Sequence, residues 1–110
     1  MIRDDSAYLK HILDSVRFIK KYSKKLTVAD FTKDELVQSA IVRQLEIIGE
    51  AANLVSLKTK RELKAVEWAK IVGMRNKLIH EYFGVDLNIV WSTIKEELPN
   101  LEKEVKNYLR

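Results

Sequence analysis

Hydrophobic residues recur along most of this chain at the spacing of an α-helix. In the first segment the apolar positions are separated by steps of four, four and three, which puts them on one face of a helix from about Asp4 to Tyr22. These positions are Tyr8, Ile12, Val16 and Ile19. Asp4 or Asp5 is expected to cap this helix, because an aspartate side chain can accept hydrogen bonds from the first backbone amides.

A second and longer helix is expected to begin near Thr32. Thr32 and Glu35 have the spacing of a capping box, and the flanking Phe31 and Leu36 fit the accompanying hydrophobic staple. Apolar residues then occupy a broad face over the next five turns, which predicts a central helix. Gly49 lies in its interior, where glycine costs up to about 1 kcal/mol relative to alanine, so we expect another helix to pack closely there.

The second half of the chain continues the helical pattern. A short basic helix is expected within residues 56–66, followed by a helix over Trp68–Glu81 that Gly84 ends. Asp86 is placed to cap a last helix with a heptad-like apolar stripe, which Pro99 should bend because it lacks a backbone donor. The stripe consists of Leu87, Trp91, Ile94, Leu98, Leu101, Val105 and Tyr108. These patterns predict an all-α, up-and-down bundle of four main helices with a short extra helix, in one domain spanning residues 1–110.

Composition narrows the possible chemistry. Three glycines and one proline leave few turns for a fold of many short strands. The chain has no cysteine, which excludes disulfides, thiolate nucleophiles and cysteine-based metal sites, and two histidines are too few for a histidine-rich metal site. We therefore expect no metal and no cofactor. No apolar run approaches the roughly 18–20 residues that span a bilayer, and the first residues do not form a signal peptide, so we expect a cytoplasmic protein with no membrane partner.

The formal net charge of +4 is unevenly distributed. Residues 1–25 contain seven Lys or Arg and three Asp residues, and a second basic segment spans residues 58–64. Such segments can attract phosphate-bearing partners. The simpler interpretation is that they are solvated helix surfaces, favoured near a helix C-terminus by the helix dipole.

One segment combines side chains suited to phosphate chemistry. It runs from Arg75 to Phe83, with the sequence RNKLIHEYF, and contains a guanidinium, an imidazole and a phenol. An imidazole titrates near neutrality and can exchange a proton during attack on phosphorus, while a guanidinium matches phosphate oxygens. In RNA the 2′-hydroxyl is itself the nucleophile, so neither a protein nucleophile nor a metal is required. The spacing alone also fits an ordinary helix end, where a histidine meets the dipole and an arginine bonds a tyrosine.

Several segments together resemble the HepT-like toxins of the HEPN superfamily. Arg75, Asn76, His80 and Tyr82 match the R-x4-H-x-Y motif of that family. The flanking segments are similar too, in matching order along nearly the whole chain. They are RDD with YL at residues 3–9, RQLEIIGEA at 43–51, GM at 73–74, FGVD at 83–86 and VW at 90–91.

The resemblance implies an all-α HEPN bundle that forms a homodimer, with two motifs facing each other across a shared cleft. It also implies a metal-independent endoribonuclease that acts as the toxin of a type VII toxin–antitoxin pair. The antitoxin of such a pair is an MNT-type minimal nucleotidyltransferase, which silences the toxin by transferring AMP to the motif tyrosine, here Tyr82. An added AMP would place a bulky anion beside Arg75 and His80 and repel an RNA phosphate.

These expectations assign a role to each candidate residue. His80 would be the general base for the 2′-hydroxyl or the acid for the departing 5′-oxygen, and Arg75 would bind the scissile phosphate. Asn76 would orient one of these groups, and Lys77 would help to hold RNA unless it is simply a solvated lysine. Tyr82 would contact RNA and accept AMP.

Two other classes of function stay open on the sequence. The chain could be a catalytically silent HEPN partner or substrate-binding, antitoxin-like subunit of a minimal nucleotidyltransferase, although the intact Arg75, His80 and Tyr82 set argues against this. It could also be a structural dimerisation bundle, as the heptad-like last helix would allow. Glu46 and Glu50 lie one turn apart, but pairing of Glu46 with Arg43 or a polar dimer seam explains them better than paired catalytic carboxylates.

Overall fold

The computed structural model describes residues 4–80 and 86–110, and every regular element within these ranges is helical. The elements are α1 (Ser6–Ser23), α2 (Val28–Lys33), α3 (Glu35–Leu54), α4 (Leu57–Glu62), α5 (Trp68–His80), α6 (Leu87–Ser92), the π-helical η1 (Thr93–Glu97) and α7 (Leu98–Tyr108). The expected all-α bundle is confirmed, with α1, α3, α5 and the α6–η1–α7 arm as its main helices. Two short helices, α2 and α4, accompany them instead of one. The expected stop at Gly84 lies outside the described residues.

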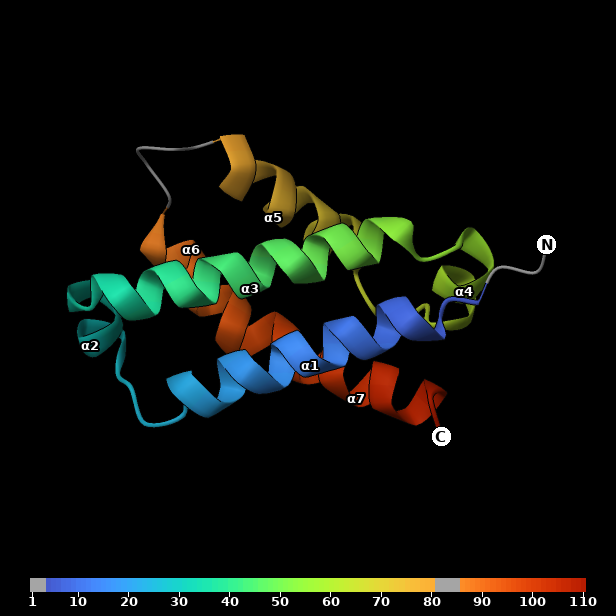
Figure 1. Ribbon diagram of the computed structural model, residues 1–110, viewed down its shortest axis with the longest axis horizontal. Coiled ribbons are helices and arrows are strands. Elements are labelled where there is room, and N and C mark those ends of the chain that lie inside the picture. The colour runs from blue at the N-terminus through green and yellow to red at the C-terminus, as the bar shows by residue number, and fades with distance from the viewer. Residues whose placement is uncertain (1–3, 81–85) are drawn as a thin grey trace.

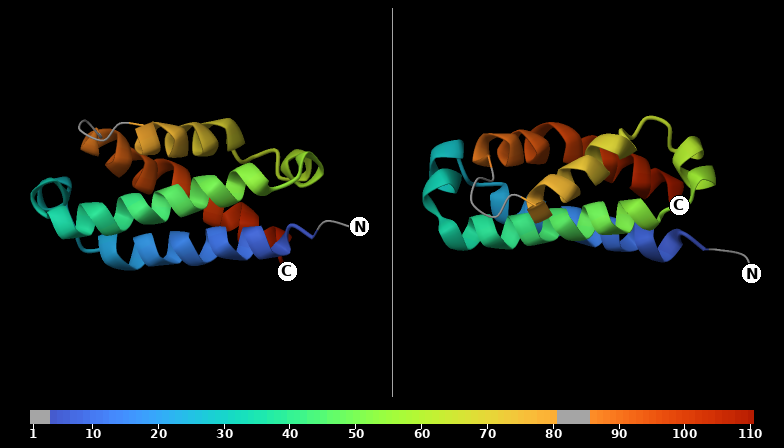
Figure 2. Two further views of the ribbon diagram at one scale, coloured as in Figure 1. Left: turned by 45° about the horizontal axis from the view of Figure 1, so that its top comes forward. Right: turned by 90° about the horizontal axis from the view of Figure 1, so that it is seen from above.

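Helix α3 is the centre of the bundle. It runs antiparallel to α1, and the two helices lie side by side along the long axis of the molecule (Figure 1). Figure 2 shows α5 and α6 on one side of α3 and α1 on the other. The C-terminal ends of both α1 and α5 point toward the end of the molecule that carries α2 (Figure 1). The molecule measures 46 × 28 × 20 Å along its principal axes.

A single apolar core joins the main helices. Its largest fully buried side chains come from α1, α2, α3 and the C-terminal arm. They are Leu9, Ile12, Ile19, Phe31, Ile41, Leu45, Ile48, Val90, Leu101 and Val105. Burial of one such side chain contributes about 1.5–3 kcal/mol, so these positions supply the main stabilisation of the bundle. No helix among the described residues is long and apolar enough to cross a membrane.

The predicted capping box at Thr32 and Glu35 is wrong. The box forms five residues earlier, at the start of α2. There Thr27 accepts a hydrogen bond from the backbone amide of Asp30, and the Asp30 carboxylate accepts one from the amide of Thr27. Thr32 lies in the last turn of α2, and Asp34 caps α3 instead by accepting from the amide of Val37. Both threonines precede a carboxylate by three residues, so the sequence pattern alone does not distinguish them.

The predicted bend at Pro99 takes the form of a π-helical segment before it. The amide of Leu98 donates to the carbonyl of Thr93, five residues earlier. Pro99 has no amide hydrogen to donate to Lys95, and a proline ring clashes with the carbonyl four residues before it. The wider π turn removes this conflict, which is why the last helix divides into α6, η1 and α7.

A buried carboxylate ties the start of α1 to the start of α4. The Asp5 side chain accepts hydrogen bonds from the backbone amide and hydroxyl of Ser56, at 3.2 and 2.5 Å, and from the hydroxyl of Thr59, at 2.6 Å. Asp5 occupies the N-cap position of α1, but its side chain makes no capping hydrogen bond there. Asp4 does bond the first turn, where its carboxylate accepts from the amide of Ser6 at 2.9 Å. This backbone hydrogen bond is the main reason why the pKa of Asp4 is lowered.

Candidate functional site

Arg75 packs against Gly49, where α5 lies close to α3. A Cβ atom added at Gly49 would lie 2.7 Å from Cγ of Arg75, nearer still to its Cβ, and 3.2 Å from the carbonyl oxygen of Ile71. Carbon atoms prefer separations of about 3.5–4.0 Å, so only glycine leaves room for Arg75 at this depth. The expected close approach at Gly49 is therefore confirmed, and the group that fills the space is the stem of the motif arginine.

The Arg75 guanidinium is held from one side. Nη1 donates a hydrogen bond to the Oδ1 atom of Asn76 at 2.9 Å, while Nε is buried without a hydrogen-bond partner among the described residues. The ion pairs found in residues 4–80 and 86–110 do not include Arg75. A cation that lacks a carboxylate partner keeps its charge available for an anion, and a buried unpaired donor is the kind of cost that functional sites retain.

His80 is the last residue of α5, five positions after Arg75. The two backbone positions are therefore about 7.5 Å apart along the helix axis, at about 1.5 Å per residue. The side chain of His80 and the whole of Tyr82 lie outside what the structure describes. The roles expected of these two residues stay predictions.

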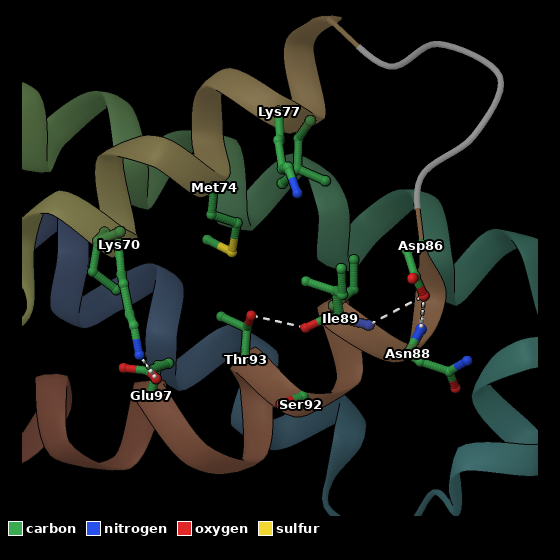
Figure 3. Close-up of a pocket in the computed structure, with 12 residues that line it drawn as sticks. Lys70, Met74, Lys77, Asp86, Asn88, Ile89, Ser92, Thr93 and Glu97 are labelled. Atoms are coloured by element: carbon green, nitrogen blue, oxygen red, sulfur yellow. Dashed lines mark hydrogen bonds and ion pairs between the residues drawn. The ribbon is translucent and has the colours of Figure 1, made fainter.

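Lys77 lies on a different face of α5 from Arg75. It lines a cavity of about 420 Å³ between α5 and the α6–η1 segment (Figure 3). Met74, Leu78 and Ile89 contribute to its apolar lining, and Asn88, Ser92 and Thr93 contribute polar side chains. Two residues apart on a helix means about 200° of rotation, so Arg75 and Lys77 do not form one site within this chain.

Charges around this cavity largely neutralise one another. Lys70 pairs with Glu67 at 2.8 Å and with Glu97 at 3.6 Å, and Asp86 lies at the opposite edge of the cavity from Lys70 (Figure 3). The hydrogen bond to Glu67, followed by the charges of Glu67 and Glu97, raises the pKa of Lys70. With two lysines and two carboxylates in its lining, the cavity offers no excess charge for a phosphate.

Glu46 and the two tryptophans of the chain have structural roles. Glu46 accepts a hydrogen bond from Arg43 at 3.4 Å, as expected for a surface pair. Trp68 is buried, and its indole nitrogen donates to the carbonyl of Leu63 at 3.2 Å. Trp91 packs against Phe31 with ring centroids 5.4 Å apart, so both tryptophans act as packing residues within the chain.

Comparison with known proteins identifies the relatives of this bundle. The model of a family described as "Ribonuclease HepT-like" matches residues 12–108. The chain belongs to the HepT-like ribonuclease family. One curated relative is 47% identical over 103 residues, which is 94% of this chain and 92% of the relative; it is named "Putative RNase TTE0752" and comes from Caldanaerobacter subterraneus subsp. tengcongensis.

Archaeal relatives give the same result across nearly their whole length. "Probable ribonuclease HepT" of Thermococcus cleftensis is 38% identical, covering 93% of each chain. "Putative RNase MJ1380" of Methanocaldococcus jannaschii is 36% identical over 94% of this chain and 95% of its own. No solved structure matches this HepT-like chain.

Sequence reasoning missed the contact that positions Arg75. Gly49 indicated close packing, but its partner lies 26 residues further along the chain, and helix periodicity carries no signal for such a pair. Within residues 4–80 and 86–110 no three carboxylate or imidazole groups gather where they could share a metal ion.

Proposed function

We propose that this HepT-like chain is the RNA-cleaving toxin of a type VII toxin–antitoxin pair, with Arg75 and His80 as its catalytic residues. Its membership of a ribonuclease family supports cleavage of RNA as the reaction. The observation that carries the choice of site is Arg75 itself, a guanidinium without a described carboxylate partner, fixed against Gly49 on the helix that ends at His80.

The proposed reaction needs no group beyond the RNA and these side chains. His80 removes the proton from a ribose 2′-hydroxyl, and the resulting oxygen attacks the adjacent phosphorus. The bond from phosphorus to the 5′-oxygen then breaks, and that oxygen receives a proton. The products are a 2′,3′-cyclic phosphate and a free 5′-hydroxyl.

Arg75 would stabilise the charge that builds on the phosphate oxygens during this attack. A guanidinium presents donors in a fixed planar fork, and electrostatic stabilisation of this kind is worth more in a site that excludes water. Asn76 holds Nη1 from one side, so the guanidinium does not have to be ordered when the substrate arrives. Asn76 is thus a positioning residue in this proposal.

A homodimer would supply the second proton-transfer group. Two copies of α5 facing each other across a cleft would bring two imidazoles to one phosphate, one as base and one as acid. The resemblance to HepT-like toxins is the support for this arrangement.

Silencing by the partner nucleotidyltransferase would act on the same cleft. Transfer of AMP to Tyr82 adds a phosphodiester anion two residues after His80, where it would compete with RNA for Arg75. The active toxin would therefore be the unmodified chain.

Replacement of His80 by alanine tests the proposal. Purified protein is mixed with RNA, and the ends of the products are identified by mass spectrometry. The parent should give 2′,3′-cyclic phosphate ends, and His80→Ala should give no cleavage while its circular dichroism spectrum stays helical. Full activity of His80→Ala would overturn the proposed mechanism. A parent chain that binds a nucleotidyltransferase but never cuts RNA would favour the silent-partner function.

A further inference from the structure

A strongly cationic surface covers the C-terminal half of α1, on the opposite side of α3 from α5. Five of its residues come from α1 and the residues just after it, and one comes from η1; all six are exposed. This α1 basic surface consists of Arg17, Lys20, Lys21, Lys24, Lys25 and Lys95. Apart from the exposed Asp14 one turn earlier, the solvent face of α1 in this half is basic or aromatic.

Few of these charges are neutralised. Of these six residues, only Lys20 forms an ion pair within the described part of the chain, with Glu102 at 3.2 Å. Two other ammonium groups lie over aromatic rings, Lys21 5.3 Å from the centroid of Tyr22 and Lys95 4.6 Å from that of Trp91. A helix C-terminus accounts for one or two lysines through its dipole, but not for six cations that include one from another element. Their summed field attracts a polyanion.

The surface is also hollowed. A cavity of about 250 Å³ lies between α1 and the η1–α7 segment. Its charged lining residues are Lys20, Lys24, Lys95 and Glu102, and its apolar ones are Val16, Ile19, Ile94, Leu98 and Pro99. Lys95 lies in the π-helical segment that precedes Pro99, and π-helical segments often occur at functional sites. Glu102 pairs with Lys20, so Lys24 and Lys95 leave the hollow with a net positive charge beside an apolar lining. This combination suits the phosphate and the base of a nucleotide.

An aromatic pair, the exposed Tyr22 and the half-buried Phe18, extends this surface around α1. Tyr22 is 50% exposed, and its ring lies 4.7 Å from that of Phe18. Single-stranded nucleic acids are bound by surfaces that combine such stacking platforms with a cationic groove. The 58–64 basic segment lacks this combination. Its Lys60 lies over the buried Trp68, and its Glu62 accepts a hydrogen bond from Tyr108.

We propose that the α1 basic surface is a second binding site for single-stranded RNA, separate from the site at Arg75. The lysines and Arg17 contact phosphates, Tyr22 stacks on one base, and the hollow beside Lys24 accepts another. The inference deepens the proposed function, because the strand held here is the one that is cut at Arg75. Helix α1, which carries this surface, and helix α5, which carries Arg75, both end toward the α2 end of the molecule (Figure 1). Ten stacked nucleotides at about 3.4 Å each span about 34 Å, which exceeds the 28 and 20 Å that the molecule measures across its shorter axes. One strand is therefore long enough to reach from the α1 basic surface to Arg75.

Two charge-matched triple variants test this site. Lys21→Gln, Lys24→Gln and Lys25→Gln remove three exposed cations from the α1 basic surface; Lys58→Gln, Arg61→Gln and Lys64→Gln remove three exposed cations from the other segment. Each variant lowers the formal net charge from +4 to +1. Binding of a 12-nucleotide RNA with 2′-O-methyl groups, which blocks cleavage, is measured by fluorescence anisotropy over a series of salt concentrations.

The α1 variant should bind at least tenfold more weakly than the parent. Its slope of log affinity against log salt should fall by up to about 2, at about 0.7 per contacted phosphate, while the control variant should change affinity less than twofold. Tyr22→Ala should weaken binding about fivefold or more, and Tyr22→Phe, which keeps the ring, should not. Equal losses in both triple variants, or no loss in the α1 variant, would overturn the inference.

The outcome is separable from that of the proposed function. A parent chain that binds the uncleavable RNA through the α1 basic surface but never cuts ordinary RNA would contradict the proposed cleavage and leave the second site standing. If the parent chain cuts RNA and the α1 variant binds RNA as tightly as the parent, the proposed cleavage stands and the second binding site is contradicted.

Discussion

Gly49→Ala should remove ribonuclease activity without unfolding the protein. The new methyl group would lie 2.7 Å from Cγ of Arg75 and closer to its Cβ, against a preferred carbon separation of about 3.5 Å. The position of this methyl group is fixed by the α3 backbone. The nearest Arg75 atom, its Cβ, is fixed in the same way by the α5 backbone, so no side-chain rotation relieves that contact. Helix α5 must therefore shift by roughly 1 Å, and Arg75 must shift with it.

The magnitudes follow from this displacement. Overpacking of this kind costs about 1–3 kcal/mol, and the better helix propensity of alanine returns about 1 kcal/mol. The net loss of stability, about 0–2 kcal/mol, leaves the protein folded. A misplacement of about 1 Å in a catalytic group can cost about 100-fold in rate, so kcat should fall by about that factor.

Gly73→Ala is the matched control. Gly73 lies in α5, and a Cβ atom there meets nothing within 4 Å. This substitution should raise the free energy of unfolding by up to about 1 kcal/mol and leave kcat within twofold of the parent. Thermal unfolding and single-turnover RNA cleavage are measured for both variants. A Gly49→Ala protein as active as Gly73→Ala would refute the claim that Gly49 positions Arg75.

A double-mutant cycle separates positioning from general damage. Arg75→Gly removes both atoms that the new methyl group would meet most closely, so the stability cost of Gly49→Ala should largely disappear in that background. An unchanged cost would show that the clash lies elsewhere on α5, as at the carbonyl of Ile71.

Three further predictions concern regulation and stability. Tyr82→Phe should keep its ribonuclease activity in the presence of the partner nucleotidyltransferase and ATP, conditions that silence the parent; silencing of both would exclude Tyr82 as the essential AMP acceptor. Asp5→Ala removes the acceptor of charge-assisted hydrogen bonds that join α1 to α4, and should lower the free energy of unfolding in urea by about 2–4 kcal/mol; a change below about 0.5 kcal/mol would contradict this role. The hydrogen bond from Tyr108 to Glu62, at 2.7 Å, is the main reason why the pKa of Tyr108 is raised from its usual 10.0. Its contribution should be fully present below pH 10.0 and lost as the pH rises through the higher folded-state pKa, so the stability difference between the parent and Tyr108→Phe should shrink from pH 9 to pH 11; a constant difference would contradict the assignment.

Local patterns predicted most of the helices because they depend on neighbours along the chain. The apolar face of α1 and the long stripe of α3 follow from a period of 3.6 residues, and α1 begins and ends within two residues of its predicted limits. The cap at Asp86 was equally local, since its carboxylate accepts from the amide of Asn88 at 2.9 Å. The short helix α2 was missed because its signal competes with an equivalent one five residues later.

Long-range contacts could not be predicted in the same way. The hydrogen bonds of Asp5 reach Ser56, 51 residues away, and the α5 contact at Gly49 joins two helices whose pairing the apolar pattern does not specify. Asp5 was expected to cap α1 because aspartate favours that position, but the hydroxyls of Ser56 and Thr59 at the start of α4 donate to the same carboxylate. The motif at Arg75 was identified from its residue types, while the packing of Arg75 against Gly49 of α3 required the structure.

The central claim is that the guanidinium of Arg75, whose aliphatic stem packs on Gly49, stabilises the breaking of an RNA phosphodiester. The direct test is the single-turnover rate of RNA cleavage by Arg75→Ala compared with Arg43→Ala, which removes an exposed arginine from the surface of α3. The account predicts a loss of about 100- to 1,000-fold for Arg75→Ala, as for other groups that stabilise charge in a transition state, and a change below threefold for Arg43→Ala. Equal rates for the two variants, or an Arg75→Ala protein that cleaves as fast as the parent, would contradict it.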